Sequence, residues 1–423
     1  MKYLSKRYCA FFAAGLAFVL FSCFAPLDGK NGNGSITIGI PGRSAVTAAE
    51  AADFSYAISL TGPGGEITHL ISRGQSLFWS VSVLPGLWTV MVRAYTGGGA
   101  LRGTGYDHVM VTAGDAAEAR ITLTPTTAVY NYAQLAAAFE TAGDGELILV
   151  CGDVKLDNLL DFAGVPPGAV VTLAADAGTR TITRGSSYTA GDGCFFLVNG
   201  DGNLVLGAPG SPFAAGTLVL DGGDFYVAPM NALIVVLAGS QLIMNDNTVL
   251  QNNDNGASSG GGGVLVDGVF TMNGGTIRGN SASSSGGGVL VNVGVFTMNG
   301  GTIRGNRSNA GGGVLLAAGD GFYMNGGTIQ ENTAPSGPGA SVRGTFTMSG
   351  NALADNVDLA TPGTTVITIT GDLTHNPAAN ITGGFGFSSS DQILGGSPAL
   401  VARNYRRFRV SGGRIDSSGK FQP

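Results

Sequence analysis

The chain reads GGGVLVDGVFTMNGGTIRGN from Gly261 to Asn280, GGGVLVNVGVFTMNGGTIRGN from Gly286 to Asn306 and GGGVLLAAGDGFYMNGGTIQEN from Gly311 to Asn332. These are near-copies of one segment, and their methionines, Met272, Met298 and Met324, lie 26 residues apart. A more divergent copy carries Met348, and an earlier copy carries Met244. A unit of this size buries its apolar face only against its neighbours, so the sequence predicts a solenoid.

Within one copy the apolar residues alternate with polar or small ones, as in Val264 and Val266, then Phe270 and Met272. This period of two is typical of strands. Glycine clusters separate three such runs, so we expect three short strands to form one triangular turn of a β-helix. The region from Leu147 to Asn380 would then hold on the order of nine coils.

Stacked coils lie about 4.8 Å apart, so equivalent residues form ladders along the axis. Apolar ladders are expected inside, from Val264, Val289 and Val314 and from Ile277, Ile303 and Ile329. Asn280, Asn306 and Asn332 coincide at one corner. We interpret them as structural, because Asn tolerates a left-handed backbone and its amide can bond along the ladder. Arg278 and Arg304 also align and must face outward, which makes them a candidate exposed binding ladder.

The GGGVLV and FTMN elements resemble the repeats of bacterial polymorphic outer-membrane proteins and related surface proteins with the pectin-lyase-like fold. The resemblance covers Leu242–Asn356 and implies a right-handed parallel β-helix in the cell envelope. It also implies a capping helix before the first coil. Asn131 and Gln134 form a capping pair there, followed by Leu135, Ala138 and Phe139 on one helical face.

The N-terminus has the pattern of a secretory signal, with Lys2, Lys6 and Arg7 before the apolar run 10–21. LFSC at Leu20–Cys23 resembles a bacterial lipobox, which implies a lipoprotein signal peptide over 1–22 and lipidation of Cys23. Phe21 departs from the small residue usual there, although the looser lipoboxes of spirochaetes permit it. An ordinary signal sequence cleaved nearby is the alternative.

Phe24 follows Cys23 where an inner-membrane retention signal would have Asp, so the expected location is the outer membrane, surface-exposed, with the periplasmic face as the alternative. The formal net charge is −6, and removal of the basic signal makes it more negative. Nucleic acid is therefore not an expected partner.

Residues 23–34 are short, polar and glycine-rich, and we interpret them as a flexible tether. Alternating short runs over 35–125 predict a small β-sandwich. Within it, LPGLWTVMVRAY at Leu84–Tyr95 resembles a strand of carboxypeptidase-regulatory-like or prealbumin-like modules. Trp79 and Trp88 could form a carbohydrate platform, but aromatic residues at this spacing more often lie in a core. The predicted capping helix and β-helix occupy 126–384.

The segment 385–423 is basic, with six of the 22 Lys and Arg residues between Arg403 and Pro423 and Asp416 as its only acid there. It could bind anionic glycan or lipid headgroups, or form the solvated face of a terminal strand at Phe408–Val410. Cys9 lies in the signal and Cys23 is the expected lipidation site, which leaves Cys151 and Cys194, at a separation near two coils. That distance exceeds disulfide reach, so we expect two buried thiols.

Catalysis on a β-helix needs carboxylates gathered on one face of adjacent coils. In the repeats Asp246, Asp267 and Asp320 stand at different positions relative to their methionines, so they do not stack. The less regular early coils could still gather acids from among Asp153, Asp157, Asp161, Asp221 and Asp224. Three acids with an Arg in one cleft would indicate glycan processing. The histidines have no metal-ligand spacing, so neither a catalytic residue, a metal nor a cofactor is predicted.

Two functions remain. The first is a non-enzymatic, lipid-anchored envelope protein whose rigid β-helix serves adhesion, display or structural interaction with a host or matrix protein or glycan. The second is a polysaccharide-binding or polysaccharide-cleaving β-helix protein. A spacer without a specific ligand is a third alternative.

Overall fold

The computed structural model describes residues 33–40, 54–186, 188, 193–223, 232–256, 260–317, 321–361, 365–383, 386–389 and 391–423. The predicted signal peptide, the lipidation site Cys23 and all but the last two residues of the expected tether lie outside these residues, as do Asp224 and Asp320. Contacts divide the chain into two compact units, and each is described by itself. No helix in the described ranges is both long and apolar enough to span a membrane.

The first unit runs to Val129 and includes Gly145–Cys151 and Gly210–Ala214. One of its sheets has the strand order β4-β1-β7, and another part has the antiparallel order β3-β2-β5-β6, with β8 and β9 paired in parallel. Its strands are β1 (Gly34–Gly39), β2 (Ser55–Gly62), β3 (Gly65–Ile71), β4 (Phe78–Val83), β5 (Gly86–Tyr95), β6 (Leu101–Val111), β7 (Ala116–Arg120), β8 (Thr124–Val129) and β9 (Glu146–Val150).

Alternate residues of both sheets share one core in this unit, including Ile36 and Ile38 from β1 and Val90 and Val92 from β5. Two sheets that bury their facing side chains form a sandwich. Trp88 belongs to this core, and its indole Nε1 donates to the carbonyl of Leu84 at 2.8 Å. Trp79 is half-buried and stacks on His69 with ring centroids 4.2 Å apart. The two indoles therefore do not form a shared exposed platform.

The second unit begins with helix α2 (Tyr132–Thr141), as the sequence predicted. The Asn131 side chain accepts a hydrogen bond from the Gln134 amide, and the Gln134 side chain accepts one from the Tyr130 amide. Leu135, Ala138 and Phe139 are buried. Phe139 packs on Phe162 and Phe196, with ring centroids 5.0 and 5.8 Å away. The helix thus covers the apolar end of the first coils.

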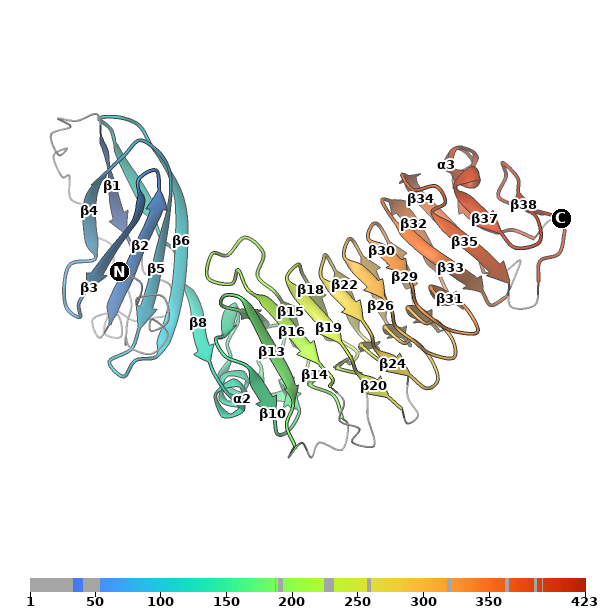
Figure 1. The fold of residues 1–423 in the computed structure, drawn as a ribbon, viewed down its shortest axis with the longest axis horizontal. Helices are drawn as coiled ribbons and strands as arrows, with labels where there is room; N and C mark the ends of the chain where they lie inside the picture. Colours follow the sequence, from blue (N-terminus) through green and yellow to red (C-terminus); the bar gives the residue numbers. More distant parts are fainter. Residues whose placement is uncertain are drawn as a thin grey trace. The chain divides into compact units, whose positions relative to one another are not determined.

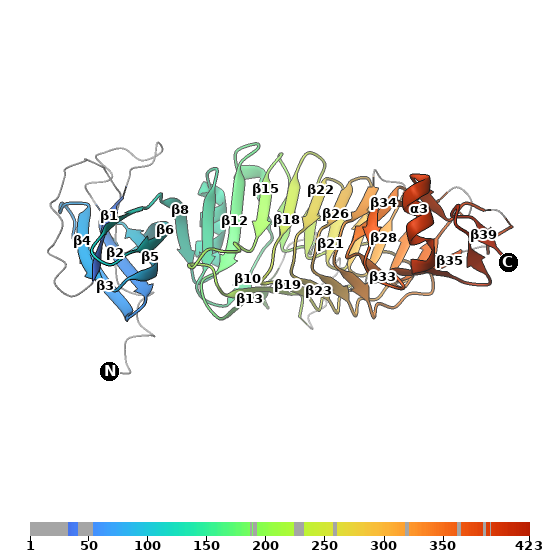
Figure 2. The ribbon, with the colours of Figure 1, turned by 90° about the horizontal axis from the view of Figure 1, so that it is seen from above.

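The rest of this unit is a parallel β-helix, drawn from green to red in Figure 1, and its coils build three stacks of parallel strands (Figures 1 and 2). Stack 1 contains β10 (Val154–Leu156), β13 (Thr179–Arg184), β16 (Thr217–Asp221), β19 (Thr248–Gln251), β23 (Thr276–Arg278), β27 (Thr302–Arg304), β30 (Thr328–Gln330) and β33 (Leu353–Leu359). Stack 2 contains β11 (Leu160–Asp161), β14 (Phe196–Val198), β17 (Ile234–Val236), β21 (Val264–Val266), β25 (Val289–Val291), β28 (Val314–Leu316) and β31 (Ala340–Val342).

Stack 3 contains β12 (Val170–Ala175), β15 (Asn203–Leu206), β18 (Gln241–Met244), β22 (Val269–Met272), β26 (Val295–Met298), β29 (Gly321–Met324), β32 (Phe346–Gly350), β34 (Ile367–Leu373) and β36 (Leu394–Gly396). A short parallel pair, β20 (Asp254–Asn255) and β24 (Ser281–Ala282), and the 3-10 turn η1 (Phe162–Gly164) complete the coils. Each near-identical repeat contributes one strand to each stack, so the predicted three-stranded coil is confirmed. The right-handed winding stays a prediction, in line with the preference of parallel crossovers for that hand.

The interior holds the predicted apolar ladders. Val264 pairs in register with Val289 and Val289 with Val314, and Ile277, Ile303 and Ile329 pair likewise. All six side chains are fully buried. Beside them Phe270, Phe296, Phe322 and Phe346 stack face to face, with ring centroids 4.7, 4.9 and 4.9 Å apart. The spacing of parallel strands fixes this ring separation.

The glycine run that opens each repeat is required by close packing between coils. A Cβ on Gly288 would lie 2.6 Å from the carbonyl oxygen of Gly313, and one on Gly313 would lie 2.5 Å from that of Gly339. Neither distance is sterically possible without a backbone shift, so the corner between stacks 1 and 2 admits no side chain there.

Strand pairing extends past residue 384, where the sequence suggested that the β-helix ends. β33 pairs with β30 and β31, so stacks 1 and 2 merge there and continue through β35 (Ala379–Gly383) to β37 (Phe408–Val410). Between β36 and β37 the chain forms helix α3 (Pro398–Asn404) and the 3-10 turn η2 (Tyr405–Arg407). The antiparallel pair β38 (Arg414–Ile415) and β39 (Phe421–Gln422) follows.

Cys151 and Cys194 are not joined in a disulfide in the described chain. Cys194 is buried as expected, whereas Cys151 is only half-buried, because it follows the end of β9 rather than pointing into a coil.

Removal of one ring from the phenylalanine stack should destabilise the β-helix. Phe296→Ala is expected to lower the free energy of unfolding by about 3–5 kcal/mol, because it leaves a cavity between Phe270 and Phe322. Thr297→Ala is the matched control, since Thr297 is the next residue and is only half-buried. Urea denaturation followed by circular dichroism measures both, and equal midpoints for the two variants would contradict the expected role of the stack.

Candidate functional site

The corner asparagines form a buried hydrogen-bonded ladder. Asn306 Oδ1 accepts from the backbone amide and the Nδ2 of Asn280 at 2.9 and 3.1 Å. Asn306 Nδ2 donates in turn to Asn332 Oδ1 and to the carbonyl of Ile277, both at 3.0 Å. Asn253, which the sequence analysis did not include, joins the ladder through its backbone amide nitrogen, which donates to Asn280 Oδ1 at 3.1 Å. These side chains hydrogen-bond to the backbone and to one another, which indicates a structural role.

The expected left-handed backbone lies one residue earlier than the sequence suggested. Gly279, Gly305 and Glu331 have φ angles of 64°, 63° and 58°, whereas Asn280, Asn306 and Asn332 are not among the residues with positive φ. The preceding residue makes the tight corner, which leaves each Asn side chain directed inward. The amide ladder is present as predicted, but the prediction that the asparagines themselves adopt the left-handed backbone conformation is wrong.

A buried cation lies at the N-terminal end of the ladder. Arg184 Nη2 donates to Asn253 Oδ1 at 2.8 Å and to the carbonyl of Gly193 at 2.6 Å, and Nη1 donates to the carbonyl of Gly222 at 2.9 Å. The guanidinium also lies over the Phe195 ring, 4.8 Å from its centroid. Burial lowers the pKa of Arg184. Carbonyl oxygens and an aromatic face offset part of that desolvation.

A second asparagine row is exposed at another corner, and sequence reasoning did not single it out. Asn273 donates to Asn245, Asn299 to Asn273 and Asn325 to Asn299, each from Nδ2 to Oδ1 at 3.0 Å. The signal was present, since each FTMN or FYMN element ends in this residue. In this row each Nδ2 donates to the preceding asparagine, whereas in the buried ladder Asn280 and Asn306 donate to the next one.

The outer surface of stack 1 carries a continuous polar row. Strand register places seven residues in line, one per coil: Lys155, Thr183, Asp221, Gln251, Arg278, Arg304 and Gln330. We call these residues the stack 1 row. The predicted ladder of Arg278 and Arg304 is thus part of a longer line that begins at the first coil.

Hydrogen bonds connect the middle of this row. Gln251 Nε2 donates to Asp221 Oδ2 at 2.6 Å, and Gln251 Oε1 accepts from Arg278 Nε and Nη2 at 2.9 and 2.7 Å. The chain of contacts orients the Arg278 side chain, which remains exposed. Within the described residues, the half-buried Arg304 side chain has no hydrogen bond or ion pair. Two stacked cations with one carboxylate two coils away leave this part of the row positive.

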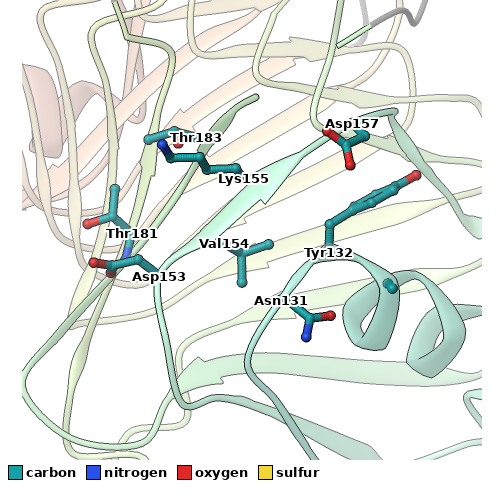
Figure 3. A pocket seen from close by; sticks show the side chains of 9 residues that line it. Asn131, Tyr132, Asp153, Val154, Lys155, Asp157, Thr181 and Thr183 are labelled. Atoms are coloured by element: carbon teal, nitrogen blue, oxygen red, sulfur yellow. The ribbon is translucent and has the colours of Figure 1, made fainter. Parts of the chain in front are cut away.

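The row begins in a cleft of about 630 Å³ beside helix α2 (Figure 3). Its walls carry Tyr132 from the helix, Asp153, Lys155 and Asp157 from the first coil, and Thr181 and Thr183 from the second. Figure 3 shows Lys155 next to Thr183 and Asp153 next to Thr181. Two carboxylates, an ammonium, hydroxyls and one aromatic ring are groups that hydrogen-bond and stack with sugars.

Some of the polar groups in the cleft stabilise the fold. Asp153 Oδ1 accepts the backbone amide of Thr181 at 2.9 Å, which holds the first two coils in register. Burial, and then the nearby carboxylates of Asp157 and Glu140, raise the pKa of Tyr132. Its phenol therefore remains a hydrogen-bond donor at neutral pH.

Of the early aspartates that the structure describes, Asp161 and Asp221 do not enter the cleft. Asp161 accepts the Ala163 amide at 2.8 Å at the start of η1, and Asp221 lies two coils further along stack 1. The cleft thus brings together two of the aspartates that the sequence suggested, with a Lys and without an Arg. No group of three or more metal-ligating side chains occurs within the described ranges.

Searches with the whole sequence and structure found no matching protein-family model, curated protein or solved structure.

The buried asparagine ladder should contribute far more stability than the exposed one. Asn306→Ala removes the acceptor of the Asn280 backbone amide and Nδ2 and the side-chain donor to the Ile277 carbonyl, and each unsatisfied buried group costs about 1–3 kcal/mol. The total loss is therefore expected to be about 3 kcal/mol.

Asn299→Ala is the control, because it removes the same amide from the exposed row of an adjacent corner. We expect it to cost less than about 1 kcal/mol, since water replaces the lost partner. Chemical denaturation of both variants provides the comparison, and a larger loss for Asn299→Ala would refute the assignment.

Proposed function

We propose that the protein is an exported, lipid-anchored envelope protein that binds a partner through the stack 1 row without transforming it. The observation that carries this proposal is the row itself, seven outward positions fixed one per coil by strand pairing. Parallel pairing on both sides makes such a surface rigid, so a partner would find its polar groups already in place.

The charge of the row supports a partner with acidic groups on its surface. Arg278 and Arg304 are adjacent along the row, and the bonded pair of Asp221 and Gln251 fixes the direction of Arg278. Preorganised cations of this kind favour encounter and specificity. A host or matrix protein at the cell surface is the partner class that accords with the expected export and lipid anchor at Cys23.

The contents of the cleft favour binding over bond cleavage. Glycoside hydrolysis and related chemistry need carboxylates free to exchange protons, at a suitable separation. In the cleft one carboxylate, that of Asp153, is committed to the Thr181 amide.

A second candidate is saccharide binding in this cleft. Tyr132, Lys155 and Thr183 present a ring, a cation and a hydroxyl on adjacent walls of one depression. Such a site would bind the end or a branch of a glycan chain rather than a protein surface.

Protease shaving of intact cells tests the location. If the β-helix is on the cell surface, peptides from Gly261–Gln330 should be released while periplasmic markers stay protected, with mass spectrometry as the readout. Release only after the outer membrane is breached would place the row in the periplasm and exclude contact with a host.

Charge reversal tests the binding face. The double variant Arg278→Glu/Arg304→Glu should lower binding of the full-length protein to host-cell monolayers and immobilised matrix proteins about tenfold, because rim charges of this kind contribute on the order of 1 kcal/mol. Arg343→Glu is the control, since Arg343 is exposed after β31 and lies outside the stack 1 row.

Unchanged binding by the double variant would refute the proposed face. Tyr132→Ala, measured in the same assay and against neutral oligosaccharides, separates the second candidate, because it should affect only saccharide binding. Tyr323→Ala, on the outer side of stack 3, is its matched control.

A further inference from the structure

The C-terminal end of the solenoid carries a second, basic depression. It has a volume of about 920 Å³, and three of its wall residues are arginines: Arg406 from η2, Arg409 from β37 and Arg414 from β38. Asp416 is its one acidic wall residue. We call this depression the C-terminal basic cleft. It lies in a chain whose formal net charge is −6, so its charge opposes that of the protein as a whole.

Other basic residues of the segment have structural partners. Arg403 forms an ion pair with Asp372 on β34, with a distance of 3.0 Å from Nε to Oδ1, and Arg407 Nη1 donates to the carbonyls of Thr374 and His375 at 3.0 and 3.2 Å. These contacts fasten α3 and η2 to the last coils. Two of the six basic residues of this segment therefore have a structural role.

The cleft arginines differ from those two. Arg409 and Arg414 are exposed, and within the described chain neither side chain has a hydrogen bond or an ion pair. Among the described residues, the interactions of the Arg406 side chain are with Tyr405, through a hydrogen bond of 2.9 Å and its position over the ring. Folding therefore gives these three guanidinium groups no acidic partner.

Asp416 offsets at most one of these three charges, and within the described residues its hydrogen bonds go to other groups. Its Oδ1 accepts from the Ser418 amide, the Ser418 hydroxyl and the Lys420 amide at 2.8, 2.7 and 3.0 Å, and its Oδ2 accepts from Gln422 Nε2 at 3.0 Å. These hydrogen bonds lower the pKa of Asp416 to about 2. The carboxylate thus holds the turn between β38 and β39, and its oxygen atoms are already occupied.

The backbone around the cleft is held by regular pairing. β37 pairs with β35 as the last strand of the solenoid, and β38 pairs with β39. Of the apolar and aromatic side chains of the wall, Phe408 and Ile415 are buried and Tyr405 and Val410 are half-buried, so none of the four is fully exposed. A peripheral membrane site needs exposed apolar side chains beside its cations for stable insertion. This cleft has the cations on a rigid frame without that apolar rim.

We propose that the C-terminal basic cleft binds acidic groups of a polyanionic polysaccharide. A guanidinium presents paired donors that match a carboxylate or a sulfate group, and three of them around one depression can hold consecutive acidic groups of a chain. The site is separate from the stack 1 row, because none of its residues belongs to that row. It explains the basic C-terminal segment, which the solenoid alone does not require.

The test uses full-length protein purified in detergent, with heparin and polygalacturonate as probes at two salt concentrations. We expect both polymers to bind in 0.05 M salt and to bind more weakly in 0.3 M salt, because counterions screen exposed charges. Arg409→Glu/Arg414→Glu should lower the affinity at least about tenfold at low salt.

Arg102→Glu/Arg343→Glu is the control, since it changes the net charge equally at exposed positions outside the cleft. It should bind the polymers within about twofold of the unchanged protein. Unfolding midpoints of both double variants check that each is folded.

Three outcomes would overturn the proposal: no binding of either polymer at low salt, equal loss in the two double variants, or binding of phosphatidylglycerol vesicles without binding of the polymers. The last would assign the cleft to a membrane surface. Arg278→Glu/Arg304→Glu should bind the polymers normally, so failure of this site and failure of the stack 1 row are distinguishable.

Discussion

Parallel pairing in strict register, coil upon coil, is the constraint on which the rest of the second unit depends. It places each residue beside its equivalent in the next coil. In the near-identical repeats each side chain must therefore pack or hydrogen-bond against a copy of itself. Aliphatic and aromatic residues meet this condition inside, where the phenylalanine rings stack at the strand spacing. Glycine meets it at the corner where a Cβ would reach the carbonyl of the coil above. Asparagine meets it because its amide is both donor and acceptor.

The two asparagine rows have opposite polarity. In the buried ladder each Oδ1 accepts from the preceding asparagine, so the side-chain carbonyl oxygens point toward the N-terminal coils and Arg184. Aligned amides polarise one another, so the negative ends of several dipoles face the buried Arg184 guanidinium. The exposed row runs the other way and contacts water. The direction of the buried ladder is therefore coupled to the cation at its end, which belongs to a less regular coil.

The regular coils could be predicted from the sequence because their residues repeat at one spacing. The apolar ladders, the three strands per coil and the helix at Asn131 all follow from local patterns. The early coils could not be aligned, because Lys155 pairs with Thr183, Thr183 with Asp221 and Asp221 with Gln251, separations of 28, 38 and 30 residues. The positions of Lys155, Thr183 and Asp221 in the stack 1 row, and the geometry of its cleft, therefore could not be predicted. The last coil was missed because α3 and η2 interrupt it, and the turn at Gly305 was assigned to Asn306 because only the backbone distinguishes the two.

The 26-residue register has a consequence at the level of the gene. Segments as similar as those beginning at Gly261 and Gly286 align with each other during recombination, and an unequal exchange would delete or add one whole repeat. Because the coils before and after the exchange present the same faces, Ile277 could pair with Ile329 as readily as with Ile303. The reading frame, the core and the corner turns would all be preserved. Such a protein could gain or lose a whole coil between generations of cells, and each variant would still be able to fold.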